Sequence, residues 1–192
     1  MLPGVVAAAI TVPQTTTSDS FNRANGALGT TDVAAGGTAK AWTSVGTGIQ
    51  VVSNQAKRTV AGAGAAFLPD VGANLLVSAK VIALANNTAG VIARAQTQVI
   101  DADRYEAYVD ASSNVSLRRV VSGAATVLGS VAGFVLGHTI ALRCAGPRIQ
   151  ALYDGSVVID VVDTTWSTGF AGMRLGSGGT NGILDDFLVE LT

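Results

Sequence analysis

The stretch from Phe134 to Thr192 decides the fold: FVLGHTIALRCAGPRIQALYDGSVVIDVVDTTWSTGFAGMRLGSGGTNGILDDFLVELT. It consists of short alternating runs separated by glycine-centred turns. Residues 138–144 place apolar side chains on one face of an extended strand. Residues 149–153 and 157–162 flank Asp154-Gly155, a dipeptide that tolerates the positive φ of a tight hairpin turn. The stretch therefore predicts strand, turn and hairpin in succession.

The same pattern continues on both sides of this hairpin. Residues 171–175 and 183–191 are expected to be strands, and the second would place Phe187, Val189 and Leu191 on one face. No heptad or amphipathic helix interrupts the pattern, so we expect an all-β, antiparallel two-sheet sandwich with a loop over residues 62–66. Earlier strands are expected at residues 49–52, 56–60, 75–84, 90–96, 105–109 and 115–121.

Composition restricts the classes of function. The chain has 192 residues, 12 Lys and Arg against 13 Asp and Glu, and a pI of about 5.7. A broad basic face for nucleic acid is therefore not expected. Charged residues make up 13% of the chain, about half of the ~25% usual in soluble domains, which suggests surface buried against other subunits. Cys144 is the only cysteine, so an intrachain disulfide is excluded, and Cys144 is expected in the core.

Two apolar segments have the length of a membrane span or the position of a targeting signal. Residues 120–142 lack formal charge, but glycines at turn-like spacing argue against a membrane-spanning helix. Residues 1–10 lack the basic start of a signal peptide, so a route other than ordinary secretion is expected. We assign residues 1–18 to an N-terminal arm that makes assembly contacts, and residues 19–192 to the sandwich domain.

Several blocks carry a resemblance to a known family. They are DSFNRANGALG (19–29), RYEAYVDASSNVSLRRVVSGAATVLGS (104–130), GHTIALRCAGPRIQALYDGSVV (137–158), WSTGFAGMRLG (166–176) and LDDFLVEL (184–191). Together, and in this order, they resemble the concanavalin A-like jelly roll in its laminin G-like form. This resemblance implies an antiparallel two-sheet jelly-roll sandwich, here with an extended N-terminal arm. The sequence composition, rich in Ala, Val, Thr and Gly, is similar to that of minor tail or decoration proteins of actinobacterial phages.

The sequence lacks the catalytic motifs that an enzyme of this fold, a serine hydrolase or a phosphate-binding enzyme would need. Glucanases of this fold take their carboxylates from a Glu-x-Asp-x-Glu strand, and retention needs two carboxylates about 5–5.5 Å apart. No such strand occurs. The nearest acids are Asp101, Asp103 and Glu106, and Asp101 and Asp103 are interpreted as a polar turn leading into Tyr105. His138 is the sole histidine and no Gly-x-Ser-x-Gly elbow exists, while residues 176–182 lack the Lys-Ser/Thr ending of a phosphate loop. We expect no enzyme and no cofactor.

Aromatic and arginine side chains are the candidates for glycan binding, since a ring can stack on a sugar and a guanidinium can bind hydroxyl or acidic groups. The candidates are Tyr105, Tyr108, Arg118, Arg119 and Trp166. Tyr105 and Tyr108 point to opposite faces of one strand, as do Arg118 and Arg119, so only one of each pair faces outward. The alternative is that all five are scattered surface residues of a sandwich.

A calcium site is the remaining metal alternative, although no metal is assigned. Asp19, Asp185 and Asp186 would come together if the first and last strands pair, and calcium prefers such oxygen ligands.

These observations and the resemblance lead to a functional expectation. The chain is expected to be a non-enzymatic phage virion protein on the tail or capsid surface, assembled as a homo-oligomer with other virion proteins through residues 1–18. Host-surface glycans are a further expected partner, whereas nucleic acid and membrane insertion are not expected. The alternatives are a lectin-like module of a bacterial surface or secreted protein, and a degenerate glycoside hydrolase.

Overall fold

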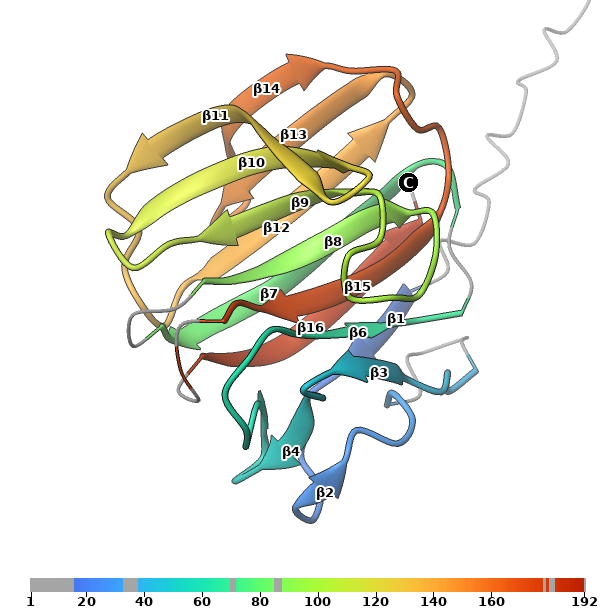
Figure 1. The fold of residues 1–192 in the computed structure, drawn as a ribbon, viewed down its shortest axis with the longest axis vertical. Helices are drawn as coiled ribbons and strands as arrows, with labels where there is room; N and C mark the ends of the chain where they lie inside the picture. The colour runs from blue at the N-terminus through green and yellow to red at the C-terminus, as the bar shows by residue number, and fades with distance from the viewer. Residues whose placement is uncertain are drawn as a thin grey trace, which may run out of the picture.

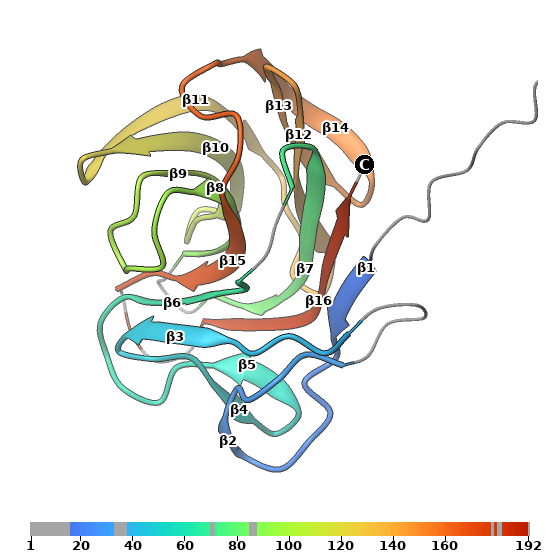
Figure 2. The same ribbon diagram turned by 90° about the vertical axis from the view of Figure 1, so that its right-hand side faces the viewer.

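The computed structural model describes residues 16–32, 38–69, 72–84, 88–177, 179 and 182–191. These residues form strands and turns without a helix, and the strands make two antiparallel sheets packed face to face (Figures 1 and 2). Over the same ranges, no helix is long and apolar enough to cross a membrane. The expected all-β sandwich is confirmed. Residues 1–15 of the assigned arm lie outside the described residues.

The seven-stranded sheet has the order β11-β10-β9-β8-β15-β6-β3. Its central strands come from the middle of the chain, and β15 inserts beside β8 from near the C-terminus (Figure 1). Its strands are β3 (Thr43–Gly46), β6 (Gly64–Phe67), β8 (Ala89–Ala95), β9 (Arg104–Val109), β10 (Asn114–Val121), β11 (Ala124–Ala132) and β15 (Phe170–Leu175).

The nine-stranded sheet has the order β14-β13-β12-β7-β16-β5-β4-β2, and β1 also pairs with β16. The first and last strands are therefore antiparallel neighbours, as the calcium alternative assumed. The strands are β1 (Thr16–Asp19), β2 (Gly26–Ala27), β4 (Gln50–Val52), β5 (Gln55–Lys57), β7 (Leu75–Ala83), β12 (Thr139–Ala145), β13 (Arg148–Tyr153), β14 (Ser156–Val162) and β16 (Ile183–Leu191).

The predicted hairpin forms between β13 and β14. Asp154 and Gly155 adopt φ values of 46° and 78°, as a primed two-residue turn requires. Alternate residues of β12 face the main core between the sheets, where Cys144 is completely buried. Burial raises the pKa of the Cys144 thiol to about 12, so this cysteine stays protonated and packs as an apolar group. Trp42 lies in the same core.

A second apolar cluster covers part of the outer face of the seven-stranded sheet. Phe67 of β6 and Ile92 of β8 point away from the main core and pack with Ala102 and Ile100 of the β8–β9 loop. This loop, residues 96–103, is held by bonds from the Gln96 side chain to the carbonyls of Arg94 and Thr168. The loop therefore lies on the outer face of the sheet, beside the first residues of β9 and the last residues of β10.

Several elements differ from the sequence-based expectations, among them the short strands β2 and β3, which were not expected. Residues 64–67, placed mostly in a loop, form the buried strand β6, because its alanines and glycine fit between β15 and β3. Strand β11 was not expected, since most of its residues are exposed. Strand β16 contains a bulge at which Asp186 has a φ of 47°, so both Leu184 and Phe187 face the core.

Candidate functional site

The candidate site lies on the outer face of the seven-stranded sheet, centred on β9. Alternation along this strand turns Tyr105 and Ala107 into the main core. Arg104, Glu106 and Tyr108 therefore occupy the opposite face. We call this group, together with Arg118 and Arg174, the arginine face.

Strand register explains why these residues meet. Arg118 of β10 lies directly opposite Glu106, since the two strands pair in that register. On the other side, Arg174 of β15 is paired with Gly90 of β8, and Gly90 is paired with Tyr108. Glycine is needed at position 90, because a Cβ there would lie 2.6 Å from the Cβ of Tyr108. No side chain on β8 separates Arg174 from β9 at this position.

Glu106 is the centre of the arginine face and is only 1% exposed. Its carboxylate accepts a bond of 3.0 Å from Arg104 Nε and bonds of 2.9 Å from Arg118 Nη2. Arg174 Nη1 lies 3.8 Å from Glu106 Oε1, within ion-pair range. Burial alone would raise the pKa of Glu106, but the three guanidinium groups outweigh it and lower the pKa. Glu106 is therefore ionised at neutral pH.

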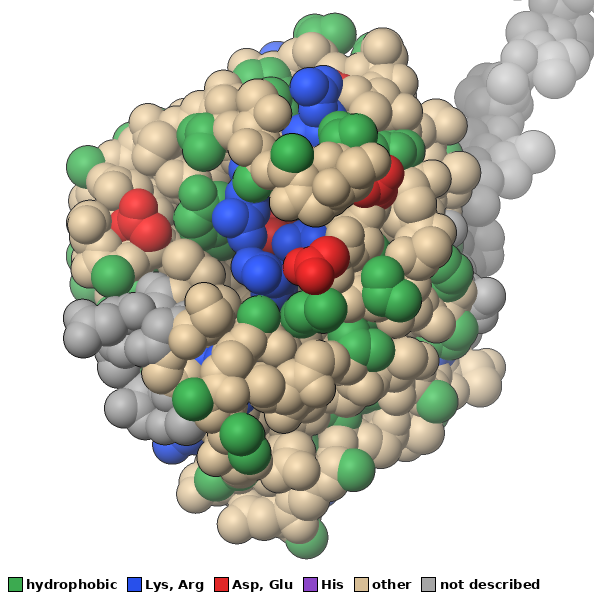
Figure 3. Space-filling model, viewed as in Figure 1, with side chains coloured by type: hydrophobic (Ala, Val, Ile, Leu, Met, Phe, Trp, Pro, Cys, Tyr) green, Lys and Arg blue, Asp and Glu red, His purple; other side chains and the backbone are tan. Residues whose placement is uncertain are grey.

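Tyr108 and Arg118 form the accessible part of this face. The Arg118 guanidinium carbon lies 4.4 Å from the centroid of the Tyr108 ring, a cation–π contact. Arg104 is also held by the β8–β9 loop, since its Nη1 donates a 2.6 Å bond to the carbonyl of Ala102. Basic side chains gather at the centre of this face with acidic atoms among them (Figure 3). Guanidinium groups and an aromatic ring are thus presented together.

The other predicted binding residues form a separate cluster. Tyr105 is completely buried and its hydroxyl donates 2.5 Å to Asp163 Oδ1. Arg119 Nη1 donates 2.7 Å to Asp163 Oδ2 and also bonds Thr165. The Trp166 ring packs edge-on against Tyr105 at 5.3 Å. Burial, reinforced by the bond to Asp163, raises the pKa of Tyr105 to about 12. The Tyr105 ring therefore cannot stack on a ligand, and Arg119 is committed to Asp163.

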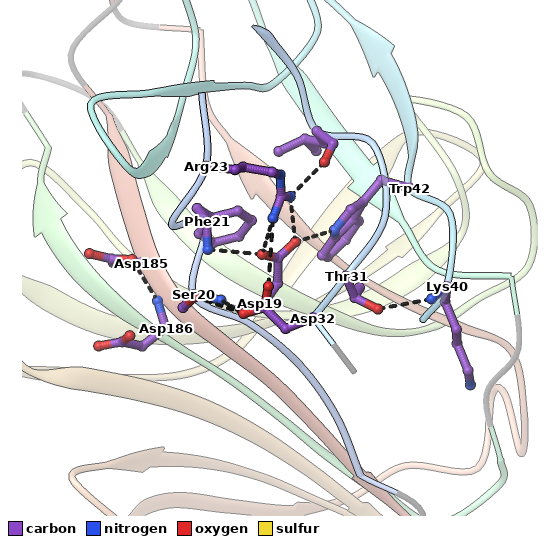
Figure 4. Close-up of polar contacts among 11 residues, drawn as sticks. Asp19, Ser20, Phe21, Arg23, Thr31, Asp32, Lys40, Trp42, Asp185 and Asp186 are labelled. Carbon is purple, nitrogen blue, oxygen red and sulfur yellow. Dashed lines mark hydrogen bonds and ion pairs between the residues drawn. The ribbon is translucent and has the colours of Figure 1, made fainter. Parts of the chain in front are cut away.

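A second buried carboxylate, Asp19, is the last residue of β1 (Figure 4). Arg23 donates to both carboxylate oxygens at 2.8 Å, and the backbone NH of Phe21 donates to Oδ1. Trp42 Nε1 donates 2.7 Å to Oδ2. A pocket of about 340 Å³ lies beside Asp19, lined by Asp32 and Asp186 among others.

The calcium alternative finds no site in the part of the chain that the structure describes. No group of three or more acidic, histidine or cysteine side chains there is arranged to hold a metal ion. Both oxygens of Asp19 are taken by Arg23, Trp42 and the backbone. Asp185 is instead bonded weakly by Gln55, and burial together with the neighbouring Asp186 raises the pKa of Asp185.

Sequence reasoning selected two members of the arginine face, Tyr108 and Arg118, and missed others. Arg104 was not considered as a binding residue, and Glu106, correctly expected in a strand, was considered only as a catalytic acid. The signal was available, since Arg104, Glu106 and Tyr108 share the face opposite Tyr105 in any extended strand. Arg174 had no such signal, because its place beside Glu106 depends on β15 pairing with β8.

Comparisons with known proteins extend to the fold alone. No family model matches the sequence, and no curated protein matches it. A carbohydrate-binding module, CBM66 from Bacillus subtilis, is 18% identical with a TM-score of 0.59, over 79% of this chain and 92% of that one. The VIP36 exoplasmic/lumenal domain, in a Ca²⁺/Man₃GlcNAc-bound form, is 14% identical with a TM-score of 0.58, over 79% and 84%.

A β-1,3-1,4-glucanase (lichenase) derived from a mouse hindgut metagenome is 12% identical with a TM-score of 0.60, over 92% of this chain and 98% of that one. At these identities the likeness shows a shared jelly-roll sandwich, which confirms the predicted fold class. Structures of this shape include both binding domains and glucanases, so the fold by itself does not separate binding from catalysis.

Proposed function

We propose that this protein is a non-catalytic carbohydrate-binding module and that the arginine face is its ligand site. The observation that carries the proposal is the half-buried Tyr108 with Arg118 packed on its ring. Neither the Tyr108 hydroxyl nor Arg118 Nη1 bonds to any described residue, so both are available to sugar hydroxyl groups. Similar folds named as a carbohydrate-binding module or solved with Man₃GlcNAc support the same function.

The chemistry of Glu106 favours binding over catalysis. A glycosidase acid must hold a proton near its working pH and must act together with a second carboxylate. The pKa of Glu106 is lowered by three arginines, which is the opposite shift. Its neighbours on the outer face of β9 are Arg104 and Tyr108, where a glucanase strand would carry two more acids. We therefore assign Glu106 to positioning the arginines.

A glycan array followed by calorimetric titration of the best ligand tests this proposal. Tyr108→Ala removes the ring and the support of Arg118, and we expect affinity to fall at least about tenfold. The matched control is Val162→Ala, an exposed apolar residue on β14 of the other sheet, which should leave affinity unchanged. An array without ligands, or a ligand bound equally well by the Tyr108→Ala variant, would overturn the proposal.

The expected place in a phage virion stays a prediction. It depends on residues 1–18, of which only residues 16–18 are described, as part of β1. A virion role is compatible with glycan binding, because a tail or capsid module can hold a host-surface sugar. Mass spectrometry of purified virions checks the location, and the oligomeric state of the purified chain checks the assembly.

A further inference from the structure

The arginine face contains more positive charge than its carboxylate neutralises. Arg104 and Arg118 both donate to Glu106, and Arg174 lies within ion-pair range of the same group. Three guanidinium groups thus share one buried carboxylate. Asp101, on the exposed surface, is the other acid whose charge acts on Arg174.

Arg174 is the least satisfied member of this group. It makes no hydrogen bond to any described residue, and its Nε is shielded from solvent without a partner. Its side chain is 15% exposed, so part of it reaches the surface. Burial, together with repulsion by Arg104 and Arg118, lowers the pKa of Arg174. A cation held in this way destabilises the fold unless something pairs with it.

Arg58 is a second buried cation near Arg174 and increases the positive potential there. Its side chain is completely buried, it donates to the carbonyl of Gly179, and its Nε and Nη1 have no partner in the described part of the chain. Burial and the charge of Arg174 lower the pKa of Arg58, so the two cations are close enough to interact. Arg58 adds charge without facing the ligand.

Other arginines show that the fold can satisfy a guanidinium group where the role is structural. Arg94 is also buried, and all three of its nitrogens donate to backbone carbonyls, those of Ala73, Gly146 and Trp166. Arg23 has its own carboxylate in Asp19. The Nε atoms of Arg23 and Arg119 are also buried without a partner, but both arginines donate to a carboxylate through another nitrogen. Arg174 has no such bond to a described residue, in a chain whose formal net charge is −1.

We propose that the arginine face binds an anionic sugar, with a carboxylate, sulfate or phosphate substituent paired to Arg174 and the sugar ring held at Tyr108 and Arg118. Guanidinium groups bind such oxyanions through paired N–H donors, and a ligand oxyanion would supply the acceptor that Arg174 lacks. This inference rests on the proposed function and specifies the class of its ligand.

Two matched pairs of polymers test the inference, each measured by calorimetry at low and at moderate salt. Dextran sulfate is compared with dextran, and polygalacturonate with its methyl ester. We expect one anionic polymer to bind at least about tenfold more tightly than its neutral partner, and the sulfate and carboxylate arms identify the preferred group. Equal affinity for both members of each pair would overturn the inference.

Three variants separate a specific site from general charge attraction. Arg174→Met should abolish the preference for the anionic polymer and raise the melting temperature of the unliganded protein. Arg174→Lys, which keeps the charge but not the paired donors, should retain part of the preference. Arg148→Ala removes the same charge from β13, where Arg148 is paired with Asp160, and should change nothing.

The outcomes distinguish this inference from the function on which it rests. If Arg174→Met keeps the anionic preference, or Arg148→Ala reduces it equally, the inference fails. If only neutral glycans bind and Tyr108→Ala weakens them, the inference fails while the carbohydrate-binding function stands. If neither charged nor neutral glycans bind, both fail together.

Discussion

Asp19 and Glu106 are both buried carboxylates bonded by arginine, but their surroundings differ in balance. Asp19 has one arginine, and its remaining bonds come from neutral donors on Phe21 and Trp42. Glu106 shares its single charge among three arginines. A cluster of balanced charge is suited to holding the fold together, whereas we propose that a cluster with excess cation offers donors to a ligand. The balance of charge, more than burial, distinguishes the two roles.

The largest effect is expected at the Asp19 cluster. Asp19→Ala would leave the indole N–H of Trp42 without an acceptor and remove the carboxylate that Arg23 binds, which would keep only the Leu28 carbonyl and the more distant Asp32. The free energy of unfolding should therefore fall by about 3–5 kcal/mol. Urea denaturation followed by tryptophan fluorescence measures this loss. Asp32→Ala is the control, because Asp32 is 45% exposed and should cost less than about 1 kcal/mol. Equal losses in the two variants would contradict a structural role for Asp19.

An intermediate effect is expected at the arginine face. Glu106→Gln removes the charge that three arginines share, so the free energy of unfolding should fall by about 2–3 kcal/mol in dilute chloride buffer. Sulfate should restore part of this loss by pairing with the arginines. Sulfate also stabilises proteins in general, so the Asp19→Ala variant provides the baseline. A sulfate response equal in both variants would remove the distinction between the clusters.

The pH dependence of the same variant checks the charge of Glu106. The folded pKa lies below the ordinary value of 4.5, so the ionised carboxylate stabilises the fold above that value. The contribution is lost as pH falls through the lowered folded pKa. The stability difference between wild type and Glu106→Gln should therefore be constant near neutral pH and shrink only below about pH 4.5. A difference that shrinks near neutral pH would show that Glu106 is not held ionised.

The smallest effect is expected at the Tyr105 cluster. Tyr105→Phe removes one hydrogen bond to Asp163 but keeps the ring and its contact with Trp166, so the loss should be about 1–2 kcal/mol. Glycan affinity should stay unchanged, because Tyr105 faces the core and Tyr108 faces outward. A fall in affinity with unchanged stability would place the ligand at the Tyr105 cluster instead.

Local patterns predicted most strands because they depend on neighbours in the sequence. The Asp154-Gly155 turn and the apolar alternation of β12 need no knowledge of the rest of the chain. The exposed strand β11 and the alanine-rich β6 lack such a pattern, since the first has little buried face and the second is buried on both faces. The bulge at Asp186 depends on fitting β16 against β7.

The sequence by itself determined that this chain is an antiparallel sandwich and that Tyr105 and Tyr108 face opposite ways, because alternation is a property of each strand alone. Only the tertiary structure decided which arginines meet Glu106. Arg104 and Arg118 come from adjacent strands, but Arg174 comes from a strand that inserts beside β8 by long-range pairing. That register, and the absence of a side chain at Gly90, bring Arg174, which has no hydrogen-bond acceptor among the described residues, to the face where we place the ligand.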